Sequence, residues 1–297
     1  MGMDTCTLCP RMCGVNRAAG EKGYCGMDAT IRAARAALHM WEEPCISGTR
    51  GSGAVFFSGC SLRCIFCQNF EIAEGNCAKE ISGERLSEIF LELQEQGAAN
   101  INLVTAAHYV PAVIESLKKA KAQGMDLPVI YNSSGYERVE TVQMLEEVVD
   151  VWLPDFKYMD SKLAFAYSRA KDYPEVARAA IREMMKAAGT CAYDEDGYIQ
   201  KGVIVRHLIL PGHTKNSIAV LDELYGTYGD DLTISLMNQY TPLPQVWNIP
   251  DLNRRVTKRE YEKVLDHALD LGITQGFFQE GGTAKESFIP LFDYEGL

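Results

Sequence analysis

The sequence lacks the features of a membrane protein and of a secreted protein. No apolar run approaches the roughly 20 residues that a helix needs to cross a bilayer. Residues 1–6 show neither the basic segment nor the apolar core of a secretory signal. Basic residues are also few, because 29 Lys and Arg stand against 40 Asp and Glu, which gives a net charge of −11. This balance argues against bulk electrostatic binding to nucleic acid or to anionic membranes, so we expect a cytoplasmic protein that binds neither.

Cysteine, in contrast, is abundant, with ten residues in a chain of 297. Closely spaced thiols in an intracellular protein are more often metal ligands than disulfide partners. Seven of the ten fall into two groups: Cys6, Cys9, Cys13 and Cys25, and then Cys60, Cys64 and Cys67. The three scattered ones, Cys45, Cys77 and Cys191, are expected to be small buried apolar residues.

From residue 54 onward, short apolar runs alternate with helical patterns. Strands are predicted at 54–58, 101–105, 128–132, 148–153, 203–210, 232–237 and 276–279, and helices at 84–96, 110–123, 139–147, 161–170, 174–188, 216–225 and 258–271. Such alternation implies a parallel sheet whose site lies at the carboxyl ends of the strands. We predict an α/β fold, an incomplete (β/α)6 TIM-like barrel over residues 51–297, with a doubly wound open sheet as the alternative. Residues 1–50 are predicted to form a small, cysteine-rich, metal-binding N-terminal extension.

The strongest chemical signal follows the first predicted strand. Cys60, Cys64 and Cys67 have the spacing C-x3-C-x2-C, so three thiolates on one loop can bind three irons of a 4Fe-4S cube. No fourth cysteine follows within the loop, which leaves the fourth iron open to another ligand, as in catalytic metal sites. A zinc loop or an electron-transfer cluster is the alternative interpretation.

With Phe66 before the last cysteine, this motif resembles the C-x3-C-x-aromatic-C of the radical S-adenosylmethionine (SAM) superfamily. In that family the open iron binds the amino and carboxylate groups of SAM. One electron then cleaves SAM to methionine and a 5′-deoxyadenosyl radical, which abstracts a hydrogen atom. The sequence around the motif, including Gln68 and Asn69, looks like the pyruvate formate-lyase activating-enzyme-like branch over about residues 44–240. The four-cysteine segment at the N-terminus looks like that of a subgroup of this branch.

The resemblance implies a radical SAM oxidoreductase with a 4Fe-4S cluster and SAM as cofactors. One expected hydrogen donor is a glycine of a partner protein, which would make the chain an activase of a glycyl radical enzyme. The other is a small molecule or a peptide. A low-potential flavodoxin or ferredoxin is the expected electron donor. A hypothesis from another class is a non-catalytic Fe–S redox sensor or electron carrier, which predicts no SAM binding and a cluster with four protein ligands.

Polar residues at the ends of the later strands are expected to bind SAM. By resemblance, Asp155 and Lys157 form an Asp-x-Lys pair near SAM, Arg206 faces the SAM carboxylate and His213 lies near the nucleoside. The second strand ends without the Gly-Gly-Glu-Pro-like turn of the superfamily, whose acid binds the SAM amino group, so Thr105 or His108 is expected to take over. The other candidates are Phe66, Asn69, Asn132, Ser134 and Asn238, with Gln279-Glu280 as a weaker pair. Structural alternatives are an ion pair for Asp155 and Lys157, a core or capping role for His108, and loop caps for Asn132 and Ser134.

The N-terminal cysteines have the spacing C-x2-C-x3-C-x11-C. Glycines at positions 14, 20, 23 and 26 permit the tight turns of a metal knuckle. A closed zinc site with four thiolate ligands and an auxiliary iron–sulfur cluster both fit this pattern.

Overall fold

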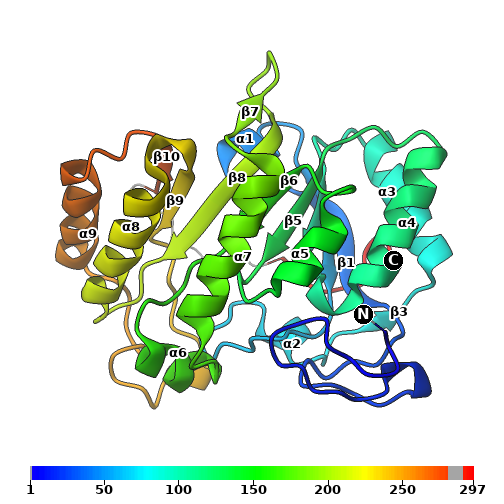
Figure 1. The fold of residues 1–297 in the computed structure, drawn as a ribbon, viewed down its shortest axis with the longest axis horizontal. Coiled ribbons are helices and arrows are strands. Elements are labelled where there is room, and N and C mark those ends of the chain that lie inside the picture. The colour runs from blue at the N-terminus through cyan, green and yellow to red at the C-terminus, as the bar shows by residue number, and fades with distance from the viewer. Residues whose placement is uncertain (1, 280–289) are drawn as a thin grey trace.

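The chain folds around one mostly parallel sheet. The computed structural model describes residues 2–279 and 290–297, in which the strand order is β10-β9-β8-β6-β5-β4-β2-β1-β3, with β7 beside β8 (Figure 1). The strands are β1 (Arg32–His39), β2 (Ser52–Phe57), β3 (Lys79–Glu80), β4 (Ile101–Val104), β5 (Val129–Ser133), β6 (Val151–Pro154), β7 (Ala192–Tyr193), β8 (Ile199–Leu208), β9 (Thr233–Met237) and β10 (Gly276–Phe278). The α-helices are α1 (Pro44–Ser47), α2 (Phe70–Ala73), α3 (Gly83–Glu95), α4 (Val110–Ala122), α5 (Val139–Leu145), α6 (Ser161–Ser168), α7 (Tyr173–Ala188), α8 (Thr214–Tyr228) and α9 (Lys258–Asp270).

The sheet is open, and its helices form one outer layer. Strands β2, β4, β5, β6, β8, β9 and β10 run parallel in successive pairs, whereas β1 and β3 add antiparallel strands at one edge. Within the described ranges, the edge strands β10 and β3 do not pair with each other. Successive helices pack side by side, as α3 does with α4 and α8 with α9. These features confirm the predicted incomplete barrel, because a doubly wound sheet has helices on both faces.

Local sequence signals explain where the elements begin. The Ser82 hydroxyl accepts the Arg85 N–H (3.0 Å) at the start of α3, and Thr257 and Glu260 form a capping box at the start of α9. Strands β2, β4, β5, β6 and β9 are buried along their whole lengths, as continuously apolar strands predict. All the predicted strands and helices are present, with ends displaced by a few residues.

Strand β1 was not predicted. Its sequence is rich in alanine, which favours helices. The strand forms because the small alanine side chains fit between the sheet and the chain that covers the sheet here. Residues Ala33, Ala34 and Ala36 are almost fully buried. The sheet therefore begins within the predicted N-terminal extension.

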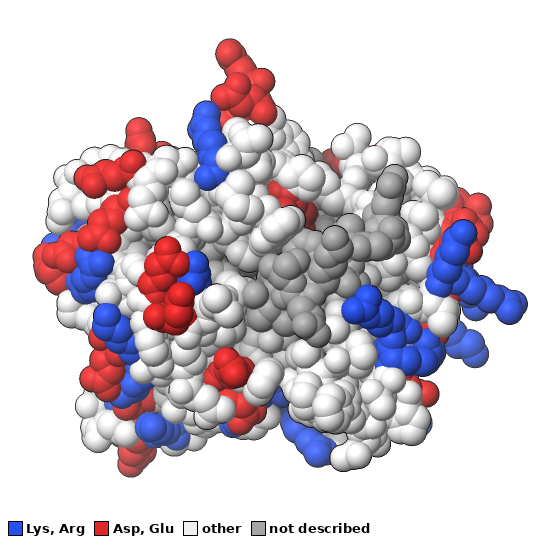
Figure 2. Space-filling model, turned by 180° about the vertical axis from the view of Figure 1, so that it is seen from behind, with Lys and Arg blue, Asp and Glu red and all other residues white. Residues whose placement is uncertain are grey.

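Residues 2–31 form a lobe that lies beside α2, at the carboxyl ends of the parallel strands (Figure 1). We call this segment the cysteine lobe. Seen from behind, Asp and Glu lie beside Lys and Arg along both sides of the molecule (Figure 2). No helix in the described part of the chain is long and apolar enough to cross a membrane.

We predict that replacing His207 with glutamine makes the stability of the protein less sensitive to acid. The buried ring pairs with Phe156 O (2.7 Å) and Ser217 Oγ (2.9 Å), and burial lowers its pKa from 6.5 to about 4. Because the folded-state pKa is lowered, the stability from neutral His207 is present above pH 6.5 and falls as the pH drops toward 4. In the variant, the free energy of unfolding should therefore fall less as the pH drops, and the difference from the wild type is at most about 1.4 kcal/mol per pH unit. Urea unfolding at pH 7 and pH 5 measures it, and an equal loss of stability in both proteins would contradict the prediction.

Candidate active site

One pocket at the carboxyl ends of the strands contains most of the predicted site residues. It reaches from the loop after β2, through the inside of the open barrel, to Trp41 and Glu42 after β1. The predicted residues that line it are Cys60, Cys64, Phe66, Cys67, Asn69, Thr105, Asn132, Ser134, Asp155, Lys157 and Arg206. His108, His213 and Asn238 are not among its lining residues.

The loop that carries Cys60, Cys64 and Cys67, here called the cluster loop, is held by hydrogen bonds to sulfur. The backbone N–H groups of Leu62 and Arg63 donate to Cys60 Sγ (3.4 and 3.5 Å), and the Ser168 hydroxyl donates to Cys64 Sγ (3.1 Å). Hydrogen bonds of this kind favour a thiolate over a thiol. The sulfurs are therefore in an environment suited to binding metal.

The donor set of the cluster loop fits a 4Fe-4S cube. Burial raises the pKa values of Cys64 and Cys67, so their free thiols are neutral and release protons when a metal binds. In the described residues, no three His, Cys, Asp or Glu side chains converge on one point as ligands of a single ion. A cube does not require such convergence, because each cysteine binds a different iron atom.

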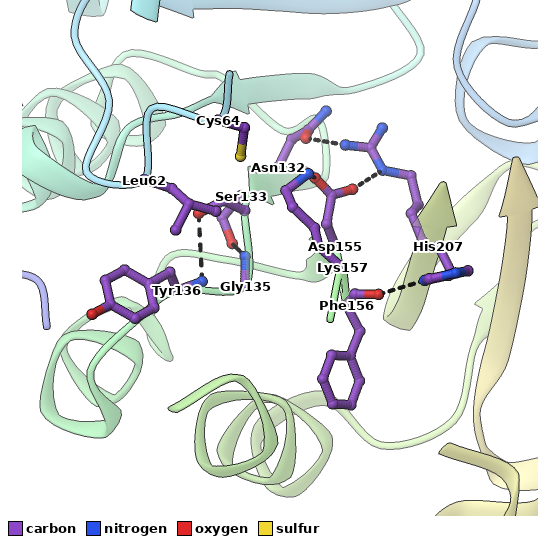
Figure 3. A network of polar contacts seen from close by, with 12 residues as sticks. Leu62, Cys64, Asn132, Ser133, Gly135, Tyr136, Asp155, Phe156, Lys157 and His207 are labelled. Carbon is purple, nitrogen blue, oxygen red and sulfur yellow. Dashed lines mark hydrogen bonds and ion pairs between the residues drawn. The ribbon is translucent and has the colours of Figure 1, made fainter. Parts of the chain in front are cut away.

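Four charged side chains form a chain of ion pairs next to the cluster loop. Figure 3 shows Asp155 and Lys157 of this chain near Cys64. Asp155 accepts from Lys157 Nζ (2.5 Å) and from Arg206 Nε (3.2 Å), and Arg206 also donates to Glu42 Oε2 (3.0 Å) and Asn132 Oδ1 (2.6 Å). Burial disfavours the charge on Asp155, but Lys157 and Arg206 outweigh it and lower the Asp155 pKa. For Lys157, the attraction of Asp155 likewise outweighs burial, so its pKa is raised. The pair therefore stays ionised at neutral pH.

Glu42 was not predicted as a site residue. Its Oε1 accepts from Asn102 Nδ2 (3.1 Å) and Asn132 Nδ2 (3.2 Å), and its side chain is only 10% exposed. Among the described lining residues, Glu42 and Asp155 are the carboxylates. No spacing in the sequence links Glu42 to this pocket, because the residue reaches it only after the antiparallel strand β1.

The turn after β4 carries a strained residue. Thr105 has a φ of 62°, in the left-handed region that β-branched residues rarely adopt. Such strain gathers at functional sites, where the surrounding structure enforces it. Here it lies at the turn that lacks the glycines and the acid of the superfamily pattern.

His108 is not among the residues that line the pocket. It is 2% exposed, and its Nε2 pairs with Ser58 O (2.7 Å). Burial lowers its pKa from 6.5 to about 3, so the ring is neutral. Its contact with Ser58 instead holds the backbone just before the cluster loop.

His213 and Asn238 lie behind the residues that line the pocket. His213 Nε2 pairs with Tyr167 OH (2.9 Å), and Tyr167 in turn packs edge-on against Phe66. At the end of β9, Met237 and Gln239 line the pocket, and strand alternation turns Asn238 away from it. The Asn238 N–H donates to Gln279 Oε1 (3.0 Å), and Glu280 lies outside the described residues.

Comparisons with known proteins agree with this site. A family profile for the 4Fe-4S single cluster domain matches residues 47–170, which include the cluster loop. An uncharacterized protein of Methanocaldococcus jannaschii is 29% identical over 270 residues, which cover 89% of this chain and 74% of that protein.

Two solved structures show how far the fold is shared. HydG, a maturase of the FeFe-hydrogenase, matches with a TM-score of 0.53 and 16% identity, over 77% of this chain and 52% of its own. A domain of pyruvate-formate lyase-activating enzyme from Bacteroides vulgatus matches with a TM-score of 0.41 and 16% identity, over 58% of this chain and 92% of that domain. The HydG match supports the barrel fold, and the chain spans about half of HydG. Together, these matches support a 4Fe-4S domain over residues 47–170, which contain the C-x3-C-x-aromatic-C loop, and a barrel fold for the chain.

Proposed function

We propose that the protein cleaves SAM reductively at a 4Fe-4S cluster bound by Cys60, Cys64 and Cys67, and that it abstracts a hydrogen atom from a substrate. The observation that carries this proposal is the arrangement of the pocket, in which the three-cysteine loop lies beside a mostly buried chain of ion pairs. An electron carrier would need the cluster alone and would have no use for these charges.

The cluster, when bound, would supply the electron that breaks the sulfonium bond of SAM and releases the 5′-deoxyadenosyl radical. The residues around it match the charges of the amino-acid part of SAM. Asp155 and Glu42 offer carboxylates to the ammonium group. They would take the place of the acid that the superfamily pattern has after strand β4. Lys157 and Arg206 offer cations to the carboxylate group. Lys157 has three N–H donors, and in the described contacts it donates one of them to Asp155.

Aromatic and amide side chains supply the surface for the nucleoside. Phe66 packs edge-on against Tyr158, Tyr167 and Tyr240, which fixes its ring in the pocket wall. We assign Phe66 to the adenine, and Asn69, Thr105, Asn132 and Ser134 to polar contacts with SAM. His213 would act through Tyr167 rather than touch the nucleoside.

For the hydrogen donor, we propose a glycine of a partner protein, a glycyl radical enzyme, with reduction by a flavodoxin or a ferredoxin. The open edge of the sheet supports this assignment, because a barrel that does not close leaves a side through which a protein loop can enter. A small molecule or a peptide is the alternative donor.

We predict that the triple variant Cys60→Ala, Cys64→Ala, Cys67→Ala forms no 5′-deoxyadenosine. Without these thiolates the cluster has no protein ligands in the pocket. The measurement is chromatography after anaerobic reconstitution, dithionite reduction and addition of SAM. Cys191→Ala, a cysteine outside the site, is the control and should keep full product formation. Product from the triple variant would show that SAM is cleaved elsewhere.

We predict that Lys157→Met makes the cluster harder to reduce. Lys157 lies close enough to Cys64 and Cys67 to interact electrostatically with both. Net charge near an Fe–S cluster sets its reduction potential, so loss of this cation should shift the midpoint to a more negative value. EPR-monitored redox titration measures it, with the exposed Lys162→Met as the matched control. Equal midpoints in Lys157→Met and the wild type would place Lys157 outside the influence of the cluster.

The hydrogen donor is tested with the reduced protein, SAM and a candidate glycyl radical enzyme. We expect the EPR doublet of a glycyl radical in the partner, because the glycine loses the hydrogen atom that the 5′-deoxyadenosyl radical gains. Turnover of a small molecule with no partner present would overturn the activase assignment and leave the SAM chemistry intact.

A further inference from the structure

The cysteine lobe packs directly on the start of the cluster loop. Gly59, just before Cys60, has a φ of 90°. A Cβ at this position would lie 2.8 Å from Cys25 O and 2.4 Å from Met27 Cγ. Only glycine fits here, because the backbone that carries the last lobe cysteine lies against the backbone that carries the first cluster-loop cysteine.

The four lobe cysteines lie near one another, close enough for Cys9 and Cys25 to interact electrostatically with other lobe cysteines. As at the cluster loop, no three of these side chains converge on one point as ligands of a single ion. The Cys6 N–H donates to Val15 O and the Gly14 N–H donates to Cys6 O (both 3.0 Å), which folds residues 6–15 back on themselves. Gly23 faces two of the sulfurs, since a Cβ there would lie 3.0 Å from Cys13 Sγ and 3.7 Å from Cys25 Sγ. All four are free thiols, and of these Cys6, Cys9 and Cys25 are buried.

In the part of the chain that the structure describes, a buried cation beside these sulfurs has no carboxylate partner. Arg17 is 1% exposed, and its Nη1 lies 3.9 Å from Cys6 Sγ. Its other hydrogen bonds go to the backbone carbonyls of Asp28 and His108. None of the ion pairs found among the described residues includes Arg17.

An unpaired buried charge is strongly destabilising, so the Arg17 guanidinium needs a negative charge nearby. Neutral thiols do not provide one. Four thiolates around a 4Fe-4S cube carry net negative charge. The sulfurs next to Arg17 are the groups in position to carry it.

We propose that Cys6, Cys9, Cys13 and Cys25 bind an iron–sulfur cluster, in which each thiolate binds a different iron atom, with Arg17 as its counter-cation. The centre also holds the cluster loop in position, and this second part rests on the proposed function. The alternative, a zinc ion, would need the sulfurs to meet at one ion, and in the described residues no three of them do.

Two arginines connect the lobe to the cluster loop. Arg11, between Cys9 and Cys13, donates to the carbonyls of Ser61 (2.8 Å) and Ser168 (2.8 Å). Arg17 donates to the carbonyl of His108, whose ring pairs with Ser58 O (2.7 Å). Metal binding would therefore fix both ends of the segment from Ser58 to Ser61, which contains Cys60.

The metal is tested in the triple variant Cys60→Ala, Cys64→Ala, Cys67→Ala, purified without oxygen. Because its active-site ligands are gone, any stoichiometric metal belongs to the lobe, whatever the fate of SAM cleavage. By elemental and sulfide analysis we expect about four irons and four sulfides per chain, and about one zinc without sulfide would overturn the cluster. Replacing the four lobe cysteines with serine in the same background should remove this metal.

Alkylation of the wild-type protein covers the case in which these variants do not fold. With the centre present, mass spectrometry should find the four lobe cysteines protected in the native protein, and reactive after denaturation with a chelator. Metal far below one equivalent, together with native-state alkylation of the four cysteines as fast as that of the half-buried Cys191, would overturn the proposal.

The role of Arg17 is tested by Arg17→Met and by the charge-conserving Arg17→Lys. Residues that support metal ligands typically change metal affinity by about 10- to 100-fold when they are replaced. We expect at least about tenfold faster release of the metal to a chelator from Arg17→Met, and release near the wild-type rate from Arg17→Lys. Equal rates in Arg17→Met and the wild type would show that Arg17 is not the counter-cation.

Discussion

The pocket depends on one mostly buried guanidinium, that of Arg206. It joins Asn132 at the end of β5, Asp155 after β6 and Glu42 after β1, so three parts of the sheet are fixed by a single side chain. The backbone supports the same junction, because the Phe156 N–H donates to Arg206 O (2.8 Å). Removing charges from water is costly, and removing one partner from such a network leaves an uncompensated charge. The four side chains therefore hold their positions together.

This network reaches the cluster loop through Lys157. The ammonium group lies between Asp155 and the sulfurs of Cys64 and Cys67, so charges of opposite sign follow one another from Glu42 to the cluster loop. On the other side of that loop, Arg11 and Arg17 connect it to the cysteine lobe. The loop is thus supported by segments that are distant in sequence. Its geometry is set before a cofactor binds, so the cluster loop is preorganised.

The sequence was sufficient for features that depend on local pattern. Apolar runs and capping residues predicted the strands and helices, and alternation along β8 correctly placed Arg206 inside and His207 outside. Strand β1 was missed because alanine carries no strand signal, and Glu42 was missed with it, since only the antiparallel turn brings this residue inside. Asn238 was expected to face the pocket, but side chains alternate along the chain at the end of β9, and Met237 and Gln239 line the pocket instead. His108 and His213 pair with other protein groups behind the pocket, which spacing along the chain does not reveal.

The central claim is that the cluster loop leaves one iron open for SAM. EPR of the anaerobically reconstituted and reduced protein, recorded with and without SAM, tests it most directly. We predict that SAM changes the g-values of the reduced cluster, because it becomes a ligand of the open iron. A spectrum from an intact, reduced cluster that is unchanged by excess SAM would contradict the account and would indicate a cluster with four protein ligands, as in a redox sensor or an electron carrier.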